Sequence, residues 1–203
     1  MRSLTLWAAA IAVAATLTGC AQQAIILRPG PIATSTPASR AGSSWSLWVA
    51  DARDARPEGQ TGSKVGTFYT RFRKVPQTGY LEPNPEVYVK YQLSRYLLAR
   101  GWEASGPETA KGFLRLSLEE FAMKEDPGAV WDTTSVRVAY TVVISDRAGQ
   151  EFGRVRLEGG AETKSPLDTI RQVESAFRDA VADTLDALSR SEAFQKAVGQ
   201  LPP

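Results

Sequence analysis

The sequence predicts an α+β domain, a two-layer sandwich in which two helices pack on one face of a mostly antiparallel sheet. Two observations lead to this fold class. Several segments alternate apolar with polar residues or are rich in β-branched and aromatic residues, which is typical of strands. Two longer segments carry apolar residues at helical spacing. The expected order of elements is β-β-α-β-β-β-α.

The first two strands are expected near the start of the folded body, which we place at about residue 44. Residues 45–50 alternate polar and apolar side chains, and residues 64–73 are rich in β-branched and aromatic residues. The turn-forming stretch between them suits a loop that joins two strands. Residues 74–85 contain several prolines and a glycine, so we expect a loop there.

The first helix is predicted to begin at Pro85, with Asn84 as its N-cap, and to end at Arg100 before Gly101. Its apolar residues recur at i, i+4, i+7 and i+8, so they share one face that should pack on the sheet. These residues are Val89, Leu93, Tyr96 and Leu97.

Three further strands are expected at residues 114–118, 136–144 and 151–158, because apolar and polar residues alternate in each. The links between them are short, which predicts antiparallel pairing, since parallel neighbours need a long crossover. The polar residues of these strands should form a solvated face away from the helices. They include Arg137, Thr141, Arg154, Arg156 and Glu158.

A second helix is predicted for residues 166–191. Its apolar residues form one continuous stripe, which favours core packing, and the alternative interpretation is a helix that docks into a partner's groove. The stripe comprises Ile170, Val173, Phe177, Val181, Leu185 and Leu188.

The composition argues against an enzyme. The chain has no histidine and a single cysteine, which removes Ser-His and Cys-His catalysis and the usual zinc ligands, so we expect no metal and no cofactor. A hydrolase that uses carboxylates stays a minor alternative, because Glu119 and Glu120 should point to opposite faces of a strand. The formal net charge of +2 lacks the strong basic excess of nucleic-acid-binding proteins.

The N-terminus has the features of a secretory signal. Arg2 precedes an apolar run over residues 6–15, which is too short to span a membrane. The sequence Leu17-Thr18-Gly19-Cys20 resembles the lipobox of bacterial lipoproteins. The resemblance implies cleavage between Gly19 and Cys20, with a diacylglycerol on the Cys20 sulfur and an acyl chain such as palmitate on its amino group. Ala21, in place of aspartate, implies an outer-membrane anchor facing the periplasm.

The chain therefore divides into a signal peptide at 1–19, a lipidated N-terminus with a flexible tether at 20–43, one periplasmic domain at 44–199 and a tail at 200–203. The tether assignment rests on the many Pro, Ser, Thr and Ala residues. Ala24-Ile25-Ile26-Leu27 is an exception within it, and this apolar segment suits either the bilayer surface or a short edge strand.

Residues 17–198 resemble the YajG-like family of uncharacterised bacterial lipoproteins. The resemblance lies in a strand with Val49, Asp51 and Arg53 followed by Gly66, and in "VKYQLSRYLLARGWEA" and "AFRDAVADTLDALSRSEAF" for the two helices. The insert at 68–85 is longer than the family pattern. The resemblance implies an outer-membrane lipoprotein without known catalysis, whose fold is similar to accessory lipoproteins of ABC-type lipid transporters.

We therefore expect a non-enzymatic binding or scaffolding module of the cell envelope, held to the membrane by lipid on Cys20 and contacting an envelope protein. The alternative is an accessory lipoprotein of an ABC-type lipid or cell-wall transport system. Asp51, Arg53 and Trp131 are candidates for partner contact. For Asp51 and Arg53 the favoured interpretation is structural, because they lie two apart at a strand end, where they can pair or cap a turn. The aromatic residues between 68 and 91 fit core packing better than a sugar or lipid site.

Overall fold

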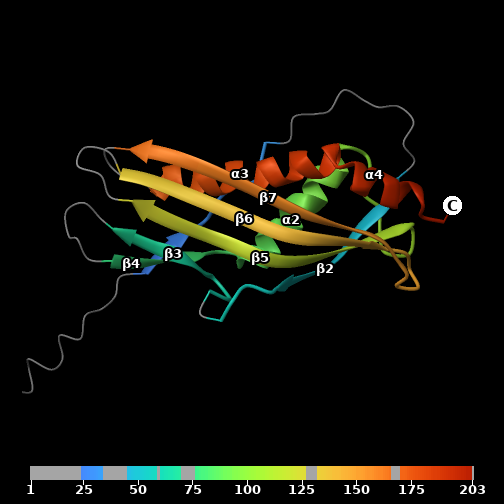
Figure 1. Cartoon of the computed structure of the whole chain (residues 1–203), viewed down its shortest axis with the longest axis horizontal. Coiled ribbons are helices and arrows are strands. Elements are labelled where there is room, and N and C mark those ends of the chain that lie inside the picture. Colours follow the sequence, from blue (N-terminus) through green and yellow to red (C-terminus); the bar gives the residue numbers. More distant parts are fainter. Residues whose placement is uncertain are drawn as a thin grey trace, which may run out of the picture.

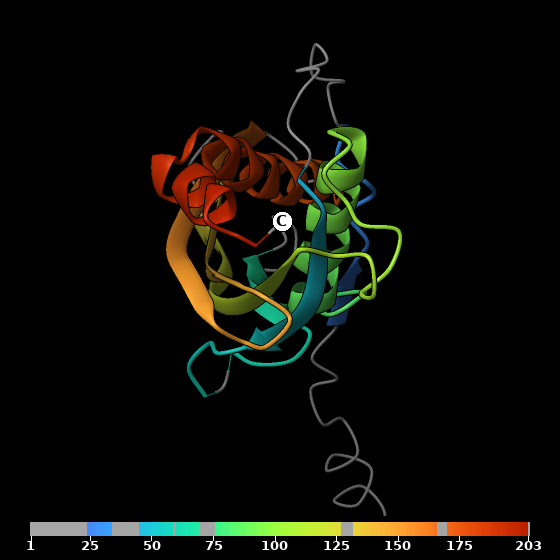
Figure 2. The same cartoon turned by 90° about the vertical axis from the view of Figure 1, so that its right-hand side faces the viewer.

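The computed structural model of the protein describes residues 24–33, 45–58, 60–69, 76–126, 132–165 and 170–202. These residues form one curved seven-stranded sheet with helices on its concave side (Figures 1 and 2). The strand order is β1-β4-β3-β5-β6-β7, and β2 also pairs with β5. The predicted α+β class with a mostly antiparallel sheet is confirmed, whereas the strand order and the helix count differ from the prediction.

The strands are β1 (Ala24–Leu27), β2 (Leu47–Asp54), β3 (Lys64–Tyr69), β4 (Pro76–Leu81), β5 (Gly112–Asp126), β6 (Asp132–Ser145) and β7 (Glu151–Ser165). The helices are α2 (Pro85–Ala99), α3 (Ile170–Arg190) and α4 (Glu192–Gly199). The predicted order therefore lacks β1, β4 and α4.

The long strand β5 is the centre of the sheet. Its whole length pairs antiparallel with β6, which in turn pairs antiparallel with β7, as the short links predict. On its other side, β5 pairs in parallel with β2 along its first half and with β3 near its end. β6 and β7 therefore lie on one side of β5, and β2 and β3 lie on the other. The sheet curves around the helices (Figure 2).

Strand β4 occupies residues that the sequence analysis assigns to a loop. Pro76 is the first residue of the strand, a position that tolerates the missing N–H of proline. Gly79 lies under the ring of Phe68, and a Cβ there would approach that ring to 2.4 Å. Both residues indicate a loop by their type, yet Pro76 begins a strand and Gly79 allows close packing against Phe68.

Residues 24–33, which the sequence analysis assigns to the tether, belong to the folded body. The segment 24–27 forms the edge strand β1 and runs parallel to β4. Leu27 and Ile32 are buried in the core. Of the two alternatives for this apolar segment, the structure shows the edge strand.

The helix faces match their predicted stripes. The face of α2 predicted to pack on the sheet is buried, and Tyr88 joins it. The stripe of α3 is buried from Val173 to Leu188, whereas Ile170 at the start of the helix is exposed. The helix predicted to end at residue 191 is followed at once by α4, because the Ser191 hydroxyl accepts a hydrogen bond from the Phe194 N–H and caps a new helix.

Aromatic side chains join the layers in the core. Phe121 of β5 stacks on Phe177 of α3 at 5.0 Å between ring centroids, and Tyr88 of α2 meets Phe121 edge-on. The Tyr140 and Thr184 hydroxyls are 2.9 Å apart in a buried hydrogen bond between β6 and α3. Because α2 and α3 both contact the β5 aromatic ring, the concave side of the sheet is filled by the core.

Candidate functional site

Charged and polar side chains are dense on the convex side of β2, β5, β6 and β7. We call this side the open face. No helix of the described segments covers it, and Figure 1 looks onto this side. The pairing registers assign its members, because paired residues share a face of the sheet. They include Asp51, Arg53, Arg115, Ser117, Glu119, Glu120, Arg137, Thr141, Arg154, Arg156 and Glu158.

Asp51 and Arg53, two of the predicted contact residues, are both exposed on this face. The Asp51 carboxylate accepts a hydrogen bond from the Ala52 N–H at 2.8 Å. The Arg53 Nε donates to the Ser117 Oγ at 3.2 Å, which joins β2 to β5. Their role in partner contact stays a prediction. Gly19, Cys20 and Trp131 lie outside the described residues.

A β-bulge changes the expectation for the adjacent carboxylates. The register shifts between Leu118 and Glu120, while Leu118 and Phe121 both stay buried on the concave side. Glu119 and Glu120 therefore both lie on the open face rather than on opposite faces. The alternation rule fails here because the bulge inserts one extra residue into β5.

Glu119 is the centre of a polar network that crosses three strands. Its carboxylate accepts hydrogen bonds from the Thr141 hydroxyl at 2.5 Å and from the Arg156 Nε at 2.8 Å. Arg156 also forms an ion pair with Glu158. The Arg156 hydrogen bond, with help from Thr141, holds the pKa of Glu119 below its usual range. Glu119 is therefore ionised near neutral pH, which disfavours it as a general acid.

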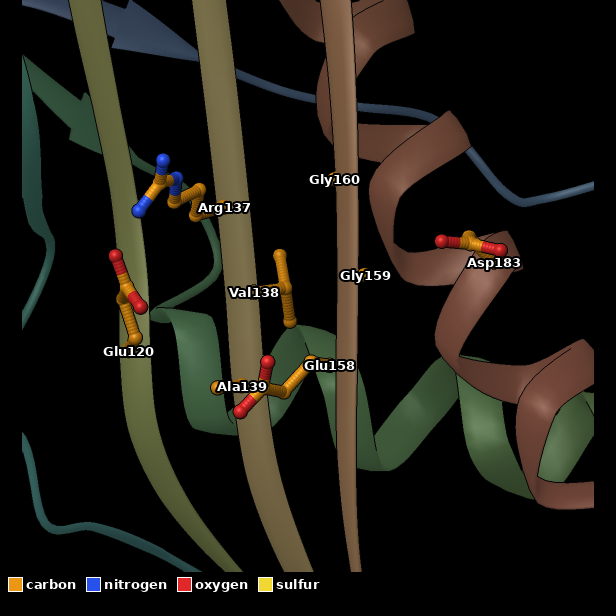
Figure 3. A pocket seen from close by; sticks show the side chains of 8 residues that line it. All are labelled: Glu120, Arg137, Val138, Ala139, Glu158, Gly159, Gly160 and Asp183. Atoms are coloured by element: carbon orange, nitrogen blue, oxygen red, sulfur yellow. The ribbon is translucent and has the colours of Figure 1, made fainter. Parts of the chain in front are cut away.

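A pocket of about 540 Å³ opens beside this network, where β7 meets α3 (Figure 3). Gly160 lacks a side chain on the open face of the edge strand, which leaves space there, whereas Gly159 faces α3 and allows the helix with Asp183 to lie close to β7. Three carboxylates and one guanidinium are among the lining groups, so the pocket has an excess of negative charge. Its lining residues are Glu120, Arg137, Val138, Ala139, Glu158, Gly159, Gly160 and Asp183.

The second half of the repeated tripeptide in Asp51-Ala52-Arg53-Asp54-Ala55-Arg56 has a structural role that the sequence analysis missed. The Arg56 side chain is fully buried and forms an ion pair with Asp54 at 2.7 Å. It also donates to the carbonyl oxygens of Gly62, Lys64 and Phe121. The cluster fastens the β2–β3 connection to β5 below the open face.

We expect Asp54 to make unfolding dependent on acid. Hydrogen bonds from the Arg56 side chain, the largest cause, hold the pKa of Asp54 below its usual range. A lowered pKa in the folded state stabilises the protein above about pH 4, near the pKa of an unfolded Asp, and this stability is lost as the pH falls through the folded value. Asp54→Asn should therefore flatten the decline of unfolding free energy below about pH 4. Denaturant titrations across acidic pH measure this, and an unchanged slope would contradict it.

Within the described segments, no group of three or more His, Cys, Asp or Glu side chains is arranged to hold a metal ion. The same segments contain no helix long and apolar enough to cross a membrane.

Comparison with known proteins shows the fold. No family model and no curated protein matches the chain, so the YajG-like resemblance stays a prediction. Among solved structures, a Xanthomonas campestris protein of family DUF330 is similar at 12% identity and a TM-score of 0.59, covering 87% of this chain and 97% of that one. An uncharacterised protein is similar at 13% identity and a TM-score of 0.50, covering 83% and 97%. At these identities the likeness establishes a shared fold alone.

A minor lipoprotein of Acinetobacter baumannii is similar at 21% identity over 56% of this chain and 84% of that one, with a TM-score of 0.39. This superposition is too loose to carry an argument.

Proposed function

We propose that this protein is a lipoprotein anchored to the outer membrane through Cys20 and facing the periplasm, where its domain binds or scaffolds an envelope protein without catalysis. The observation that carries the proposal is the lipobox-like Leu17-Thr18-Gly19-Cys20 at the end of a short apolar run. Cys20 is the only cysteine in the chain, so it cannot form an intrachain disulfide.

The open face supports the binding part of the proposal. Its charged groups from β2, β5, β6 and β7 lie on an uncovered part of the described sheet, where a partner of complementary charge can reach them. The pocket over β5, β6 and β7, which Asp183 of α3 also lines, favours a partner that presents a basic side chain, because its lining carboxylates outnumber the single guanidinium of Arg137. The low pKa of Glu119 suits a fixed ionic contact better than proton transfer.

We expect Cys20→Ala to abolish lipidation and signal cleavage. The precursor should keep residues 1–19 and should lack the mass of the acyl groups, which mass spectrometry of the membrane and soluble fractions measures. Gln22→Ala, which leaves the lipobox intact, is the matched control and should mature as the wild type does. Normal processing of Cys20→Ala would contradict the lipid anchor.

The alternative function is an accessory lipoprotein of an ABC-type transporter. Crosslinking in cells distinguishes it from the scaffolding module. Photoreactive groups at Asp51 and Asp183 report on the open face and its pocket, and Glu192 on α4 is the control position. A transport component captured at the first two sites and absent at Glu192 would favour the alternative. A non-transport envelope protein captured in that pattern would favour the scaffolding module. Equal capture at all three positions would contradict docking on the open face.

A further inference from the structure

The connection between the proposed lipid anchor and the folded body is very short. Only residues 21–23 separate Cys20 from Ala24, the first residue of β1. Even fully extended, the chain from Cys20 to Ala24 spans at most about 14 Å. A flexible tether through residue 43 would reach about 80 Å. The entry of the chain into β1 therefore lies close to any membrane that holds Cys20.

Strand β1 is fastened to the body by polar contacts at its end. The Leu27 carbonyl accepts a hydrogen bond from the Glu82 N–H at 2.9 Å. The Arg28 N–H donates to the Glu174 carboxylate of α3 at 2.7 Å, and its guanidinium pairs with Glu82. Because Leu27 is fully buried, separation of β1 from β4 would expose it.

The residues that follow β1 are fastened to α2. The Ile32 N–H donates to the Gln92 side-chain oxygen at 3.1 Å, and the Tyr88 hydroxyl donates to the Gly30 carbonyl. Ile32 is itself buried. Residues 24–33 thus make contacts with β4, α2 and α3, and we infer that the short link to Cys20 starts from a fixed point on the body.

That fixed point lies at one end of the long strands. Ala24 pairs with Thr78 near the start of β4, and Tyr69 at the end of β3 pairs with Pro76. Because β3 runs parallel to β5, the end of β5 at Asp126 is at the same end of the sheet. We call this the entry end; the β6–β7 turn and α4 lie at the opposite end (Figure 1).

Three of the six exposed large apolar side chains of the described residues lie toward the entry end, and the other three, Val87, Tyr91 and Leu98, lie on α2. Ile26 of β1 is 53% exposed, Tyr69 at the end of β3 is 40% exposed, and Ile170 at the start of α3 is 48% exposed. Tyrosine is enriched at the headgroup level of a bilayer, and aliphatic side chains are buried at the boundary with the acyl chains. This set is independent of the short connection and indicates the same orientation.

We propose that the lipidated protein stands with its entry end against the membrane surface, so that the β6–β7 turn and α4 point away from it. The proposal rests on the proposed lipidation of Cys20. A strand of the length of β5 spans about 50 Å, so the opposite end lies roughly that far from the bilayer. The open face then runs from the membrane outward, and a partner can approach it from the side.

Energy transfer to acceptor lipids tests this orientation. Lys124→Cys places a fluorescent donor near the entry end, and Ala148→Cys places it in the exposed β6–β7 turn. Lipidation consumes the Cys20 thiol, so the introduced cysteine is the only reactive one. The mature lipoprotein is reconstituted into vesicles of phosphatidylethanolamine and phosphatidylglycerol with an acceptor lipid. We expect transfer to be several-fold stronger from position 124 than from position 148.

An insertion of about 20 Gly/Ser residues between Gln23 and Ala24 is the control for the short connection. This linker adds a root-mean-square reach of about 25 Å, so the difference between the two positions should shrink. Equal transfer from both positions in the unmodified chain, or stronger transfer from position 148, would overturn the proposal. An unchanged difference in the linker variant would keep the entry end against the membrane and would assign this orientation to the exposed apolar side chains rather than to the short connection.

If Cys20 carries no lipid, the same experiment gives a different result. A protein without lipid on Cys20 would carry two reactive thiols in each cysteine variant and would not float with the vesicles. That result would refute the proposed function and this inference together. Flotation with one reactive thiol and equal transfer would refute the orientation alone.

Discussion

Arg56→Met is expected to lower the free energy of unfolding by about 3–5 kcal/mol, as removal of one partner from a buried ion pair does. The Arg56 side chain has no solvent exposure and its partner Asp54 is only 14% exposed. Methionine keeps the apolar stem but leaves Asp54 and the carbonyls of Gly62, Lys64 and Phe121 without their buried donor. Denaturant unfolding of the chain without its predicted signal segment measures the change.

Arg53→Met is the matched control, since it alters the equivalent position of the repeated tripeptide. Arg53 is exposed and makes one side-chain hydrogen bond, to Ser117, so the loss should stay within about 0.5 kcal/mol. Equal losses at the two arginines would contradict the assignment of the structural role to Arg56. If Arg56→Met fails to fold, Arg56→Lys keeps the charge without the forked geometry and should lose less.

The contrast between the two arginines shows what local sequence leaves undetermined. Both follow Asp-Ala, so the two residues that precede each arginine do not separate them. Arg56 is buried because its guanidinium meets the Phe121 carbonyl, 65 residues away in the chain. Such a contact depends on the pairing of β2 with β5 in parallel, which alternation within each strand does not indicate.

The elements that sequence predicts well are those whose pattern is local and long. Alternation locates β5, β6 and β7, and the stripes of α2 and α3 continue for several turns. Strand β5 nevertheless extends well beyond the predicted 114–118, because the bulge at Glu119 interrupts the alternation. Strand β1 has only four residues, too few to establish a period, and β4 contains Pro76 and Gly79. The parallel pairing of β2 and β3 with β5 was not predictable, because it joins segments that are distant in sequence.

In the candidate site, too, features with a local pattern are predictable and features that depend on distant contacts are not. Alternation alone predicts five side chains on the solvated face. Arg137, Arg154, Arg156 and Glu158 are exposed, whereas Thr141 is buried and its hydroxyl donates to Glu119. The bulge at Leu118–Glu120 escapes prediction because no glycine or proline marks it. The position of Asp183 at the pocket depends on how closely α3 approaches β7. This approach is possible because Gly159 has no side chain.

Gly159→Ala is expected to destabilise the fold by about 1–3 kcal/mol through overpacking. A Cβ at this position would lie 2.4 Å from the Ala180 carbonyl oxygen and 2.7 Å from the Thr184 methyl group, so α3 would have to move away from β7. The clash involves helix backbone, which cannot rotate aside as a flexible side chain can. Denaturant unfolding measures the loss.

Gly160→Ala is the control on the neighbouring residue, because its side chain would point to the open face. The nearest atom to that Cβ is the Val136 carbonyl oxygen at 3.4 Å, and replacing a strand glycine by alanine gains about 0.5 kcal/mol when the contact is tolerated. A loss at Gly160 as large as at Gly159 would contradict the assigned faces of β7. Gly160→Ala narrows the pocket without disturbing α3, so it distinguishes an effect on partner binding from an effect on stability. Weaker partner capture at Asp183 with an unchanged free energy of unfolding would place the contact in the pocket itself.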